Sequence, residues 1–269
     1  MRKLWGMLAA GLVALGSVGA VQAQETRLSD IIERQKIVIG VTSESPPFGF
    51  INDKNELDGF EIDLAKLIGR ALFGKDGHVE LVQQSFSARW DNINSGRIDF
   101  GLQVTTVYPE RLLRVAFTRP YIDTGTAVMV RSSDSYSSIE ELNKPELRAG
   151  IVTNPQQEAR RARYFPATQP VAFDGYSPLL LALRTNRVDF IQMELPQAQW
   201  YAASDERLVV LPGLISEPSY NAIFVKIGDT PLLAALDQIV ASMRGGPLHS
   251  EYSEIFEKWF GVVPDRQSP

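Results

Sequence analysis

The sequence predicts an α/β protein made of two lobes. Short runs rich in β-branched residues, typical of buried strands, alternate along the chain with segments of helical period. An internal echo favours two lobes of similar construction, because INSGRIDFGL at 93–102 resembles LRTNRVDFIQM at 183–193. Two further strand-like segments, Ile122–Arg131 and Ala222–Val225, are predicted to cross from one lobe to the other. Two crossings between the same two lobes imply a hinge.

The length and charge of the chain fit this organisation. Its 269 residues are enough for two medium-sized domains. We expect a signal peptide at 1–23, lobe 1 at 24–126 plus 221–269, and lobe 2 at 127–220. The formal net charge of −5 argues against a general nucleic-acid-binding protein.

The chain lacks cysteine and holds two histidines, His78 and His249, far apart in the sequence. It therefore has no disulfide framework, no thiol chemistry and no thiolate ligands for a metal. A histidine-based metal site is not expected either. We predict no metal and no cofactor.

The first 23 residues have the pattern of a secretory signal peptide. Arg2 and Lys3 form a basic start, Leu4–Val18 is apolar, and small residues precede a cleavage point before Gln24. A membrane anchor is the alternative, but the apolar run is shorter than the ~20 residues that a span needs. Without a cysteine there is no site for a lipid anchor. We expect a periplasmic protein that is not lipid-anchored.

The elements of lobe 1 follow from apolar periodicity and from turn residues. The first helix is expected to have Ser29 or Asp30 near its cap. In chain order the predictions are a helix at Gln24–Gln35, a strand at Lys36–Val41, a loop at Ser43–Phe50, a polar turn at Asn52–Asp58, a helix at Gly59–Leu72, a strand at His78–Gln83, a helix at Trp90–Ser95 that ends at Gly96, and a strand from Arg97.

The same signals define lobe 2 and the return to lobe 1. Asp174 is the expected cap of the second lobe-2 helix. Lobe 2 is predicted to begin at Ile139–Asn143 and to continue with a strand at Arg148–Val152, a polar loop at 153–158 that leads into a helix, a helix at Tyr176–Leu183, and strands at Val188–Gln192 and Leu208–Leu211. After the return to lobe 1, two closing helices are predicted at Thr230–Met243 and Tyr252–Phe260.

The stretch from Thr105 to Tyr121, TTVYPERLLRVAFTRPY, holds the strongest candidate for ligand binding. The guanidinium of Arg111 is a fixed fork of donors that matches a carboxylate. The hydroxyl and backbone N–H of Thr106 can complete such a grip. The alternative is a surface arginine paired with Glu110 or Asp123, since most arginines are exposed.

This stretch resembles the T-x-x-x-x-R … F-[ST]-x-P-Y segment of the periplasmic solute-binding proteins of the polar amino-acid class, family 3. The GFEIDL motif at 59–64 and the closing GGPLHSEYSEIFEKWFG also resemble that family, so the likeness covers nearly the whole chain after residue 23. The resemblance implies a type II periplasmic-binding-protein fold, with two α/β lobes, two hinge crossovers and a ligand cleft between them. It also implies a monomer that binds an amino acid and delivers it to the membrane permease of an ABC importer.

The resemblance assigns roles to individual residues. Arg111 with Thr106 would hold the α-carboxylate of an amino acid. Glu194, with the carbonyl of Val104 nearby, would hold the α-ammonium; an exposed loop acid is the alternative. Arg89 matches the arginine that holds the side-chain carboxylate in aspartate and glutamate binders, unless Asp91 simply neutralises it. The remaining expected ligand-binding residues are Phe48, Thr105, Asn154 and Tyr176, where Phe48 is alternatively a core aromatic.

One segment departs from the family pattern. The family usually has Gly-Thr-Thr where this chain has Asn154-Pro155-Gln156, and Pro155 has no N–H to donate. This departure leaves two alternatives open. One is a binder of a non-amino-acid carboxylate. The other is an enzyme similar to cyclohexadienyl or arogenate dehydratases, with Glu194 as the general acid.

The sequence shows no nucleophile–histidine pair, no Walker loop and no metal cluster. We therefore predict no catalytic residues, and a binding protein rather than an enzyme. The remaining alternative is the extracellular sensor of a signalling protein, which would have to act through a separate receptor.

Overall fold

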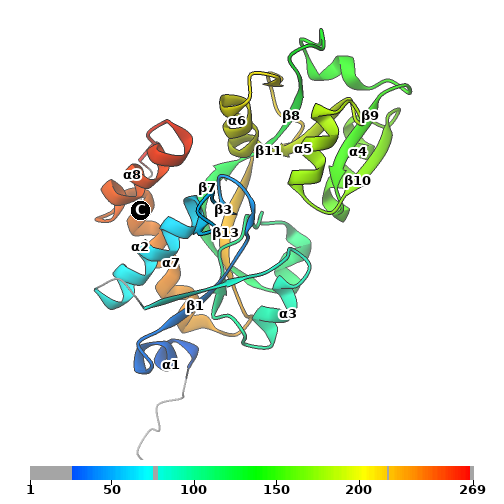
Figure 1. The fold of residues 1–269 in the computed structure, drawn as a ribbon. Helices are drawn as coiled ribbons and strands as arrows, with labels where there is room; N and C mark the ends of the chain where they lie inside the picture. Colours follow the sequence, from blue (N-terminus) through cyan, green and yellow to red (C-terminus); the bar gives the residue numbers. More distant parts are fainter. Residues whose placement is uncertain (1–25, 75–77, 217, 267–269) are drawn as a thin grey trace, which may run out of the picture.

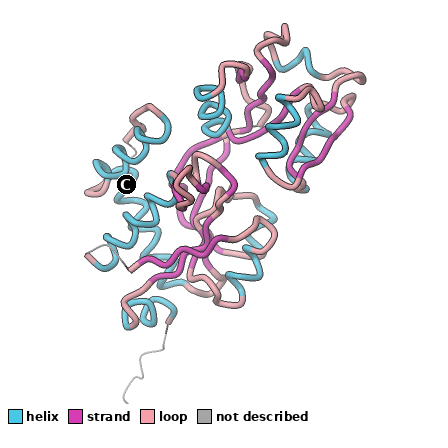
Figure 2. Tube along the Cα trace, viewed as in Figure 1, coloured by secondary structure: helices cyan, strands magenta, loops and turns pink. Residues whose placement is uncertain are grey.

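The computed structural model describes residues 26–74, 78–216 and 218–266. Figures 1 and 2 show two lobes, each with strands at its centre and helices outside them. The two-lobed α/β fold predicted from the sequence is confirmed. The predicted signal peptide lies outside the described residues, and the predicted lobe boundaries stay a proposal.

The sheet of the first lobe has the strand order β5-β1-β6-β13-β7. β1 is parallel to β5 and β6, and β13 is antiparallel to β6 and β7. The strands are β1 (Ile37–Val41), β5 (Val79–Gln83), β6 (Phe100–Gly101), β7 (Ala116–Thr124) and β13 (Ser219–Val225).

Five α-helices and a small three-stranded sheet surround this sheet. The helices are α1 (Arg27–Glu33), α2 (Phe60–Phe73), α3 (Arg89–Asn94), α7 (Thr230–Gly245) and α8 (His249–Phe260), with a 3₁₀ turn η1 at Pro109–Leu113. The small sheet consists of β2 (Glu44–Ser45), β3 (Gly49–Ile51) and β4 (Leu57–Asp58). The segment predicted as a plain loop and turn therefore contains three short strands.

The sheet of the second lobe has the order β10-β9-β11-β8-β12. Its strands are β8 (Thr126–Arg131), β9 (Arg148–Val152), β10 (Gln169–Phe173), β11 (Phe190–Glu194) and β12 (Leu208–Val210). Its helices are α4 (Pro155–Tyr164), α5 (Tyr176–Arg184) and α6 (Leu195–Ser204), with a 3₁₀ turn η2 at Ile139–Leu142.

The internal echo of the sequence corresponds to equivalent places in the two sheets. β6 lies beside β1, as β11 lies beside β9, and both pairs are parallel. The residue that ends the preceding helix is left-handed in each copy, Gly96 at φ 76° and Asn186 at φ 60°. Glycine and asparagine are the residues that adopt this conformation most readily.

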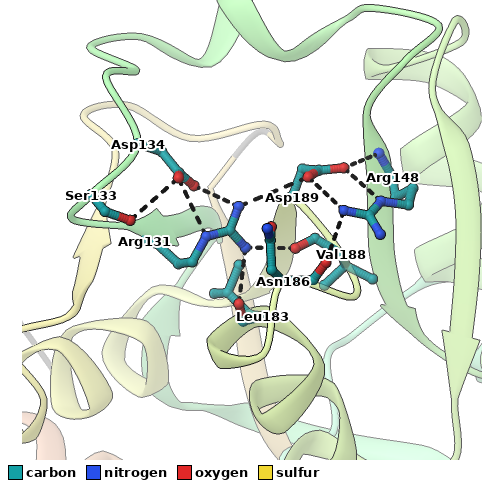
Figure 3. Close-up of polar contacts among 8 residues, drawn as sticks. All are labelled: Arg131, Ser133, Asp134, Arg148, Leu183, Asn186, Val188 and Asp189. Atoms are coloured by element: carbon teal, nitrogen blue, oxygen red, sulfur yellow. Dashed lines mark hydrogen bonds and ion pairs between the residues drawn. The ribbon is translucent and has the colours of Figure 1, made fainter.

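The aspartate of the echo does the same work in each lobe. Asp99 accepts a hydrogen bond from the N–H of Val38 in β1, and Asp189 accepts one from the N–H of Arg148 in β9. Figure 3 shows Asp189 between Arg148 and Arg131, which are 2.9 and 3.8 Å from its carboxylate. The echo therefore ties the end of a helix to an equivalent parallel strand in each sheet, β1 in the first and β9 in the second.

The chain crosses between the lobes through its longest strands. β7 of the first sheet continues through Gly125 into β8 of the second, and the chain returns between β12 and β13. A Cβ atom at Gly125 would lie 2.6 Å from the Leu214 side chain, so the two crossings pack closely.

The two predicted caps differ in outcome. α1 begins with a capping box, in which the Thr26 hydroxyl accepts the N–H of Ser29 and the Ser29 hydroxyl accepts the N–H of Thr26. The prediction that Ser29 lies near this cap is confirmed, whereas the predicted cap at Asp174 is wrong. α5 follows Gly175 without a side-chain cap, because the Asp174 carboxylate instead accepts the Thr153 hydroxyl.

Besides the three short strands β2, β3 and β4, the strand β10 and the helix α6 are also absent from the sequence prediction. The periodicity of α6 is weak, because only Gln197, Ala198 and Tyr201 of its residues are buried.

Candidate functional site

The cleft between the lobes contains a compartment that is lined from both sides. The first lobe contributes Arg89, Val104, Thr106, Tyr108 and Arg111 among others, and the second contributes Asn154, Arg160, Tyr176 and Glu194. An adjoining cavity of about 370 Å³ shares Phe86, Arg89 and Arg111 with it. The structure thus brings together seven of the nine residues expected at the site. They are Arg89, Val104, Thr106, Arg111, Asn154, Tyr176 and Glu194, whereas Phe48 and Thr105 do not line it.

Arg111 lies in the 3₁₀ turn η1 and is buried, with 8% of its surface exposed. Its Nη1 donates to the carbonyl of Thr106 at 2.7 Å, and its guanidinium lies 4.8 Å from the Tyr108 ring. Burial lowers the pKa of Arg111, against the opposing effect of nearby acids. Across the residues that the structure describes, no carboxylate lies within 4.0 Å of it, so the surface ion pair considered as an alternative is wrong.

The loop that carries Thr106 has an unusual backbone. Val104 has φ 40°, a left-handed conformation that costs a β-branched residue roughly 1–3 kcal/mol. Its N–H donates to Glu61 Oε1 at 2.6 Å, and this bond holds the turn. Val104 and Thr106 follow β6, so the turn places their backbone at the carboxyl end of the sheet, where open α/β sheets bind ligands.

Glu61 supports the loop of the site, because it accepts the N–H of Val104. From the sequence, Glu61 was interpreted only as part of a helix motif. Its carboxylate is completely buried and also accepts the Tyr121 hydroxyl. Burial raises its pKa to about 7, although Tyr121, Val104 and Arg89 favour the ionised form. Within the described residues its other oxygen has no hydrogen-bond partner. The sequence shows an acidic residue in the first turn of α2, but it does not show that this side chain is completely buried.

Arg89 begins α3 and is 5% exposed. Its Nη1 donates to the Thr105 hydroxyl at 3.1 Å, and its guanidinium lies over the Trp90 ring at 4.4 Å. Burial and the charge of Arg111 lower its pKa to about 9, against the opposing effect of Glu61. Asp91 does not neutralise it: in the described parts of the chain no carboxylate is within 4.0 Å of Arg89.

Thr105 supports Arg89 rather than facing the cavity. It is fully buried, and its hydroxyl donates to the carbonyl of Gln103 at 2.8 Å while accepting from Arg89. Both functions of the hydroxyl are therefore used within the protein.

Glu194 ends β11 and provides the negative charge of the compartment. Its Oε2 accepts the hydroxyl of Thr124 at 2.6 Å, which joins it to the end of β7 in the first lobe. Burial raises the pKa of Glu194, while Thr124, Arg160 and Arg111 act in the opposite direction. The carboxylate is thus half-buried within the cleft instead of lying on an open loop.

The departure at Asn154-Pro155-Gln156 forms the start of α4. Asn154 is the N-cap, and its Oδ1 accepts the N–H groups of Gln156 and Gln157 at 2.9 and 3.2 Å. Tyr176, at the start of α5, accepts from the Gln157 side chain at 3.3 Å. The second lobe therefore presents a self-capped helix terminus.

Phe48 is a core residue. It is 0% exposed and packs against Phe60 and Phe260, with ring centroids 6.2 and 5.8 Å away. The expectation that it walls the ligand pocket is therefore corrected, because its ring is enclosed between α2 and α8 in the core of the first lobe. A phenylalanine that does line the cleft is Phe86, which contributes to both adjoining cavities.

Among the described residues, no three His, Asp or Glu side chains gather into a group that could hold a metal ion. Nor does any helix in those ranges have the length and hydropathy to cross a membrane.

Comparison with known proteins identifies the family. The model for bacterial extracellular solute-binding proteins, family 3, matches residues 37–262. The chain belongs to this family, and the predicted resemblance is confirmed.

Among curated relatives, the ABC transporter glutamine-binding protein GlnH of Bacillus subtilis (strain 168) is 26% identical, over 94% of this chain and 93% of its own. The ABC transporter arginine-binding protein 1 of Escherichia coli (strain K12) is 24% identical, over 84% and 91%. These relatives are binding proteins of transporters.

Solved structures give the same fold. An ancestral amino acid-binding protein described as a precursor of cyclohexadienyl dehydratase matches with a TM-score of 0.78 at 24% identity, covering 87% of this chain and 99% of its own. An ancestral arginine-binding protein bound to arginine matches with a TM-score of 0.73 at 28% identity, covering 85% and 99%.

Proposed function

We propose that this protein captures a polar amino acid in its cleft, outside the inner membrane, and delivers it to the permease of an ABC importer. The observation that carries this proposal is the pairing of unneutralised Arg111 from one lobe with Glu194 from the other in a single compartment. A zwitterion requires such a pair, a cation for its carboxylate and an anion for its ammonium group. The named functions of the curated relatives support the same class of ligand.

In this proposal each residue contacts one part of the ligand. Arg111 and Thr106 hold the α-carboxylate. Glu194 and the carbonyl of Val104 hold the α-ammonium group. Asn154 and Tyr176 complete the wall on the second lobe.

Arg89 favours an acidic side chain on that ligand. Two buried guanidinium groups in one compartment repel each other: burial, and after it the charge of Arg111, lowers the pKa of Arg89. Buried charges are stable only when paired, so a second carboxylate on the ligand would complete the site. We therefore propose aspartate or glutamate as the preferred class.

A ligand that touches both lobes would also close the cleft. It would favour the closed form by its differential affinity for the two states, through the hinge at the two crossings. We propose that the mature protein acts as a periplasmic monomer after removal of residues 1–23.

An enzyme is the second candidate, and two observations favour it. The pKa of Glu194 is raised by burial, as a general acid requires. One structural neighbour is also described as a precursor of cyclohexadienyl dehydratase. We propose binding without catalysis, and incubation with prephenate tests this: phenylpyruvate formation that is lost on Glu194→Gln would establish the enzyme.

A thermal-shift screen of the purified chain tests the main proposal. The panel contains the twenty protein L-amino acids together with succinate, citrate and prephenate. A ligand at 100 times its Kd stabilises the folded state by about 2.7 kcal/mol, which raises Tm by several degrees. A rise with aspartate or glutamate supports the acidic class, and a rise with neutral or basic amino acids removes Arg89 as the side-chain contact. A rise with organic acids alone would replace the amino acid by another carboxylate.

A further inference from the structure

The N-terminus of α4 has few free donors for a ligand. Helix N-termini bind anions because their first N–H groups lack partners within the helix. In α4 the first residue, Pro155, has no N–H, and the next two N–H groups donate to the Asn154 side chain. The N–H of Glu158 donates to the Asn154 carbonyl. The second lobe therefore needs another group if it is to hold an anion.

Arg160 lies one helical turn after Gln156 and lines the same compartment as Arg111 and Glu194. Its Nη2 donates across the cleft to the hydroxyl of Tyr108. The ring of Tyr108 in turn lies over Arg111. The guanidinium groups of Arg160 and Arg111 thus approach one position from opposite lobes.

The partners of the arginines along α4 distinguish Arg160 from its neighbour. Arg161 pairs with Glu158 at 2.7 Å, on the same helix. For Arg160 the described residues offer no carboxylate within 4.0 Å, and its partner is a neutral phenol. A guanidinium that lines a cavity beside a phenol keeps donors for an incoming anion, because it has five N–H groups.

We propose that Arg160 is an anion-binding residue of the ligand site, and that it replaces the blocked terminus of α4 as the second lobe's contact with the carboxylate held by Arg111. The proposal rests on the proposed function, since it concerns the same ligand group. Two guanidinium forks can share one carboxylate, whose two oxygens accept about four hydrogen bonds. A carboxylate held from both lobes also couples binding to closure of the cleft.

Calorimetric titration of matched ligands tests this assignment. The L-amino acid that binds wild type most tightly in the screen is titrated beside its α-carboxamide, which lacks only the α-carboxylate charge. The proteins are wild type, Arg160→Gln, Arg160→Lys and Tyr108→Phe. Arg163→Gln is the matched control, because it makes the same change at an exposed position of α4.

We expect Arg160→Gln to lower the affinity for the amino acid by about 10- to 100-fold, because the variant loses a hydrogen bond to a charged group. Its effect on the α-carboxamide should be several times smaller, and Arg160→Lys should restore part of the affinity. Arg163→Gln should change neither. Tyr108→Phe should have a small effect, because it removes the partner of Arg160 and not its charge.

Two results would overturn the assignment. Equal losses for the amino acid and its α-carboxamide would give Arg160 a structural role only. A Tyr108→Phe variant as weak as Arg160→Gln would make the pair a latch between the lobes.

Failure of the proposed function is a separate outcome. If only succinate or citrate binds, a loss with Arg160→Gln would sustain the role of Arg160 although the amino-acid proposal had failed. Unchanged affinity there, or no carboxylate ligand at all, would overturn the assignment of Arg160.

Discussion

The two lobes share a scaffold and differ at the edge that faces the cleft. Their sheets have equivalent strand orders, and Asp99 and Asp189 accept hydrogen bonds from the equivalent strands β1 and β9. After β6 the first lobe makes a left-handed turn at Val104 and presents cations. After β11 the second lobe continues directly into α6 and presents Glu194. The difference teaches that packing fixes the repeated scaffold, while the segments after two equivalent strands set opposite charges.

The strongest test of this comparison removes the main cation of the first lobe. Arg111→Ala should weaken binding of the ligand by about 4 kcal/mol, which raises Kd roughly 1,000-fold, because the substitution leaves a desolvated carboxylate without its partner. Titration calorimetry measures the loss, and Arg97→Ala is the control at an exposed position of the same lobe. Retained affinity in Arg111→Ala would remove Arg111 from the site.

A second test concerns the support under the first lobe's turn. The pKa of Glu61 is raised to about 7 from 4.5, so the folded state binds a proton that the unfolded state releases between these values. Its contribution to stability is present at low pH and is lost as pH rises towards 7, by up to about 3 kcal/mol. Glu61→Gln should therefore reduce the fall in unfolding free energy between pH 5 and pH 8. Urea unfolding measures this difference. If the unfolding free energy falls equally in wild type and Glu61→Gln, Glu61 does not ionise with a raised pKa in the folded state.

The third test removes the anion of the second lobe. Glu194→Gln should lower the affinity for an amino acid by about 10- to 100-fold, since the variant loses a charge-assisted hydrogen bond to the ammonium group. Burial raises the pKa of Glu194, so wild-type affinity should fall as pH is lowered through that pKa. Titrations across pH should show this dependence in wild type and a weaker one in the variant. If neither Glu194→Gln nor a lower pH changes the affinity, the ammonium group does not bind at Glu194.

The smallest test probes the shared scaffold itself. Asn186→Gly should change the unfolding free energy by less than about 0.5 kcal/mol, because glycine adopts the left-handed conformation freely. Gly96→Ala, at the equivalent place, should cost about 1 kcal/mol or more. Thermal unfolding compares them. Equal effects would show that the two helix ends are not equivalent.

Much of the scaffold was predictable because its signals are local. Runs such as KIVIGV and RAGIV give strands, and the Gly96 and Asn186 echo marks two equivalent helix ends. α6 was not predictable, since its ten residues bury no continuous apolar stripe.

The site was predictable only where a motif covers it. Arg111, Arg89 and Glu194 were found through the family pattern and lie together. Arg160 was missed because α4 reads PQQEARRARY, and no periodicity tells which of its arginines faces the cleft. Phe48 was misplaced because its contact with Phe260 joins residues from opposite ends of the chain.

The most direct measurement is a crystal structure of the wild-type chain with the amino acid that binds most tightly. The account predicts the α-carboxylate on Arg111 and the α-ammonium group within hydrogen-bond distance of Glu194, with one lobe on each side of the ligand. A ligand outside the cleft, or one whose ammonium group does not contact Glu194, would contradict the assignment of the carboxylate to Arg111 and of the ammonium group to Glu194.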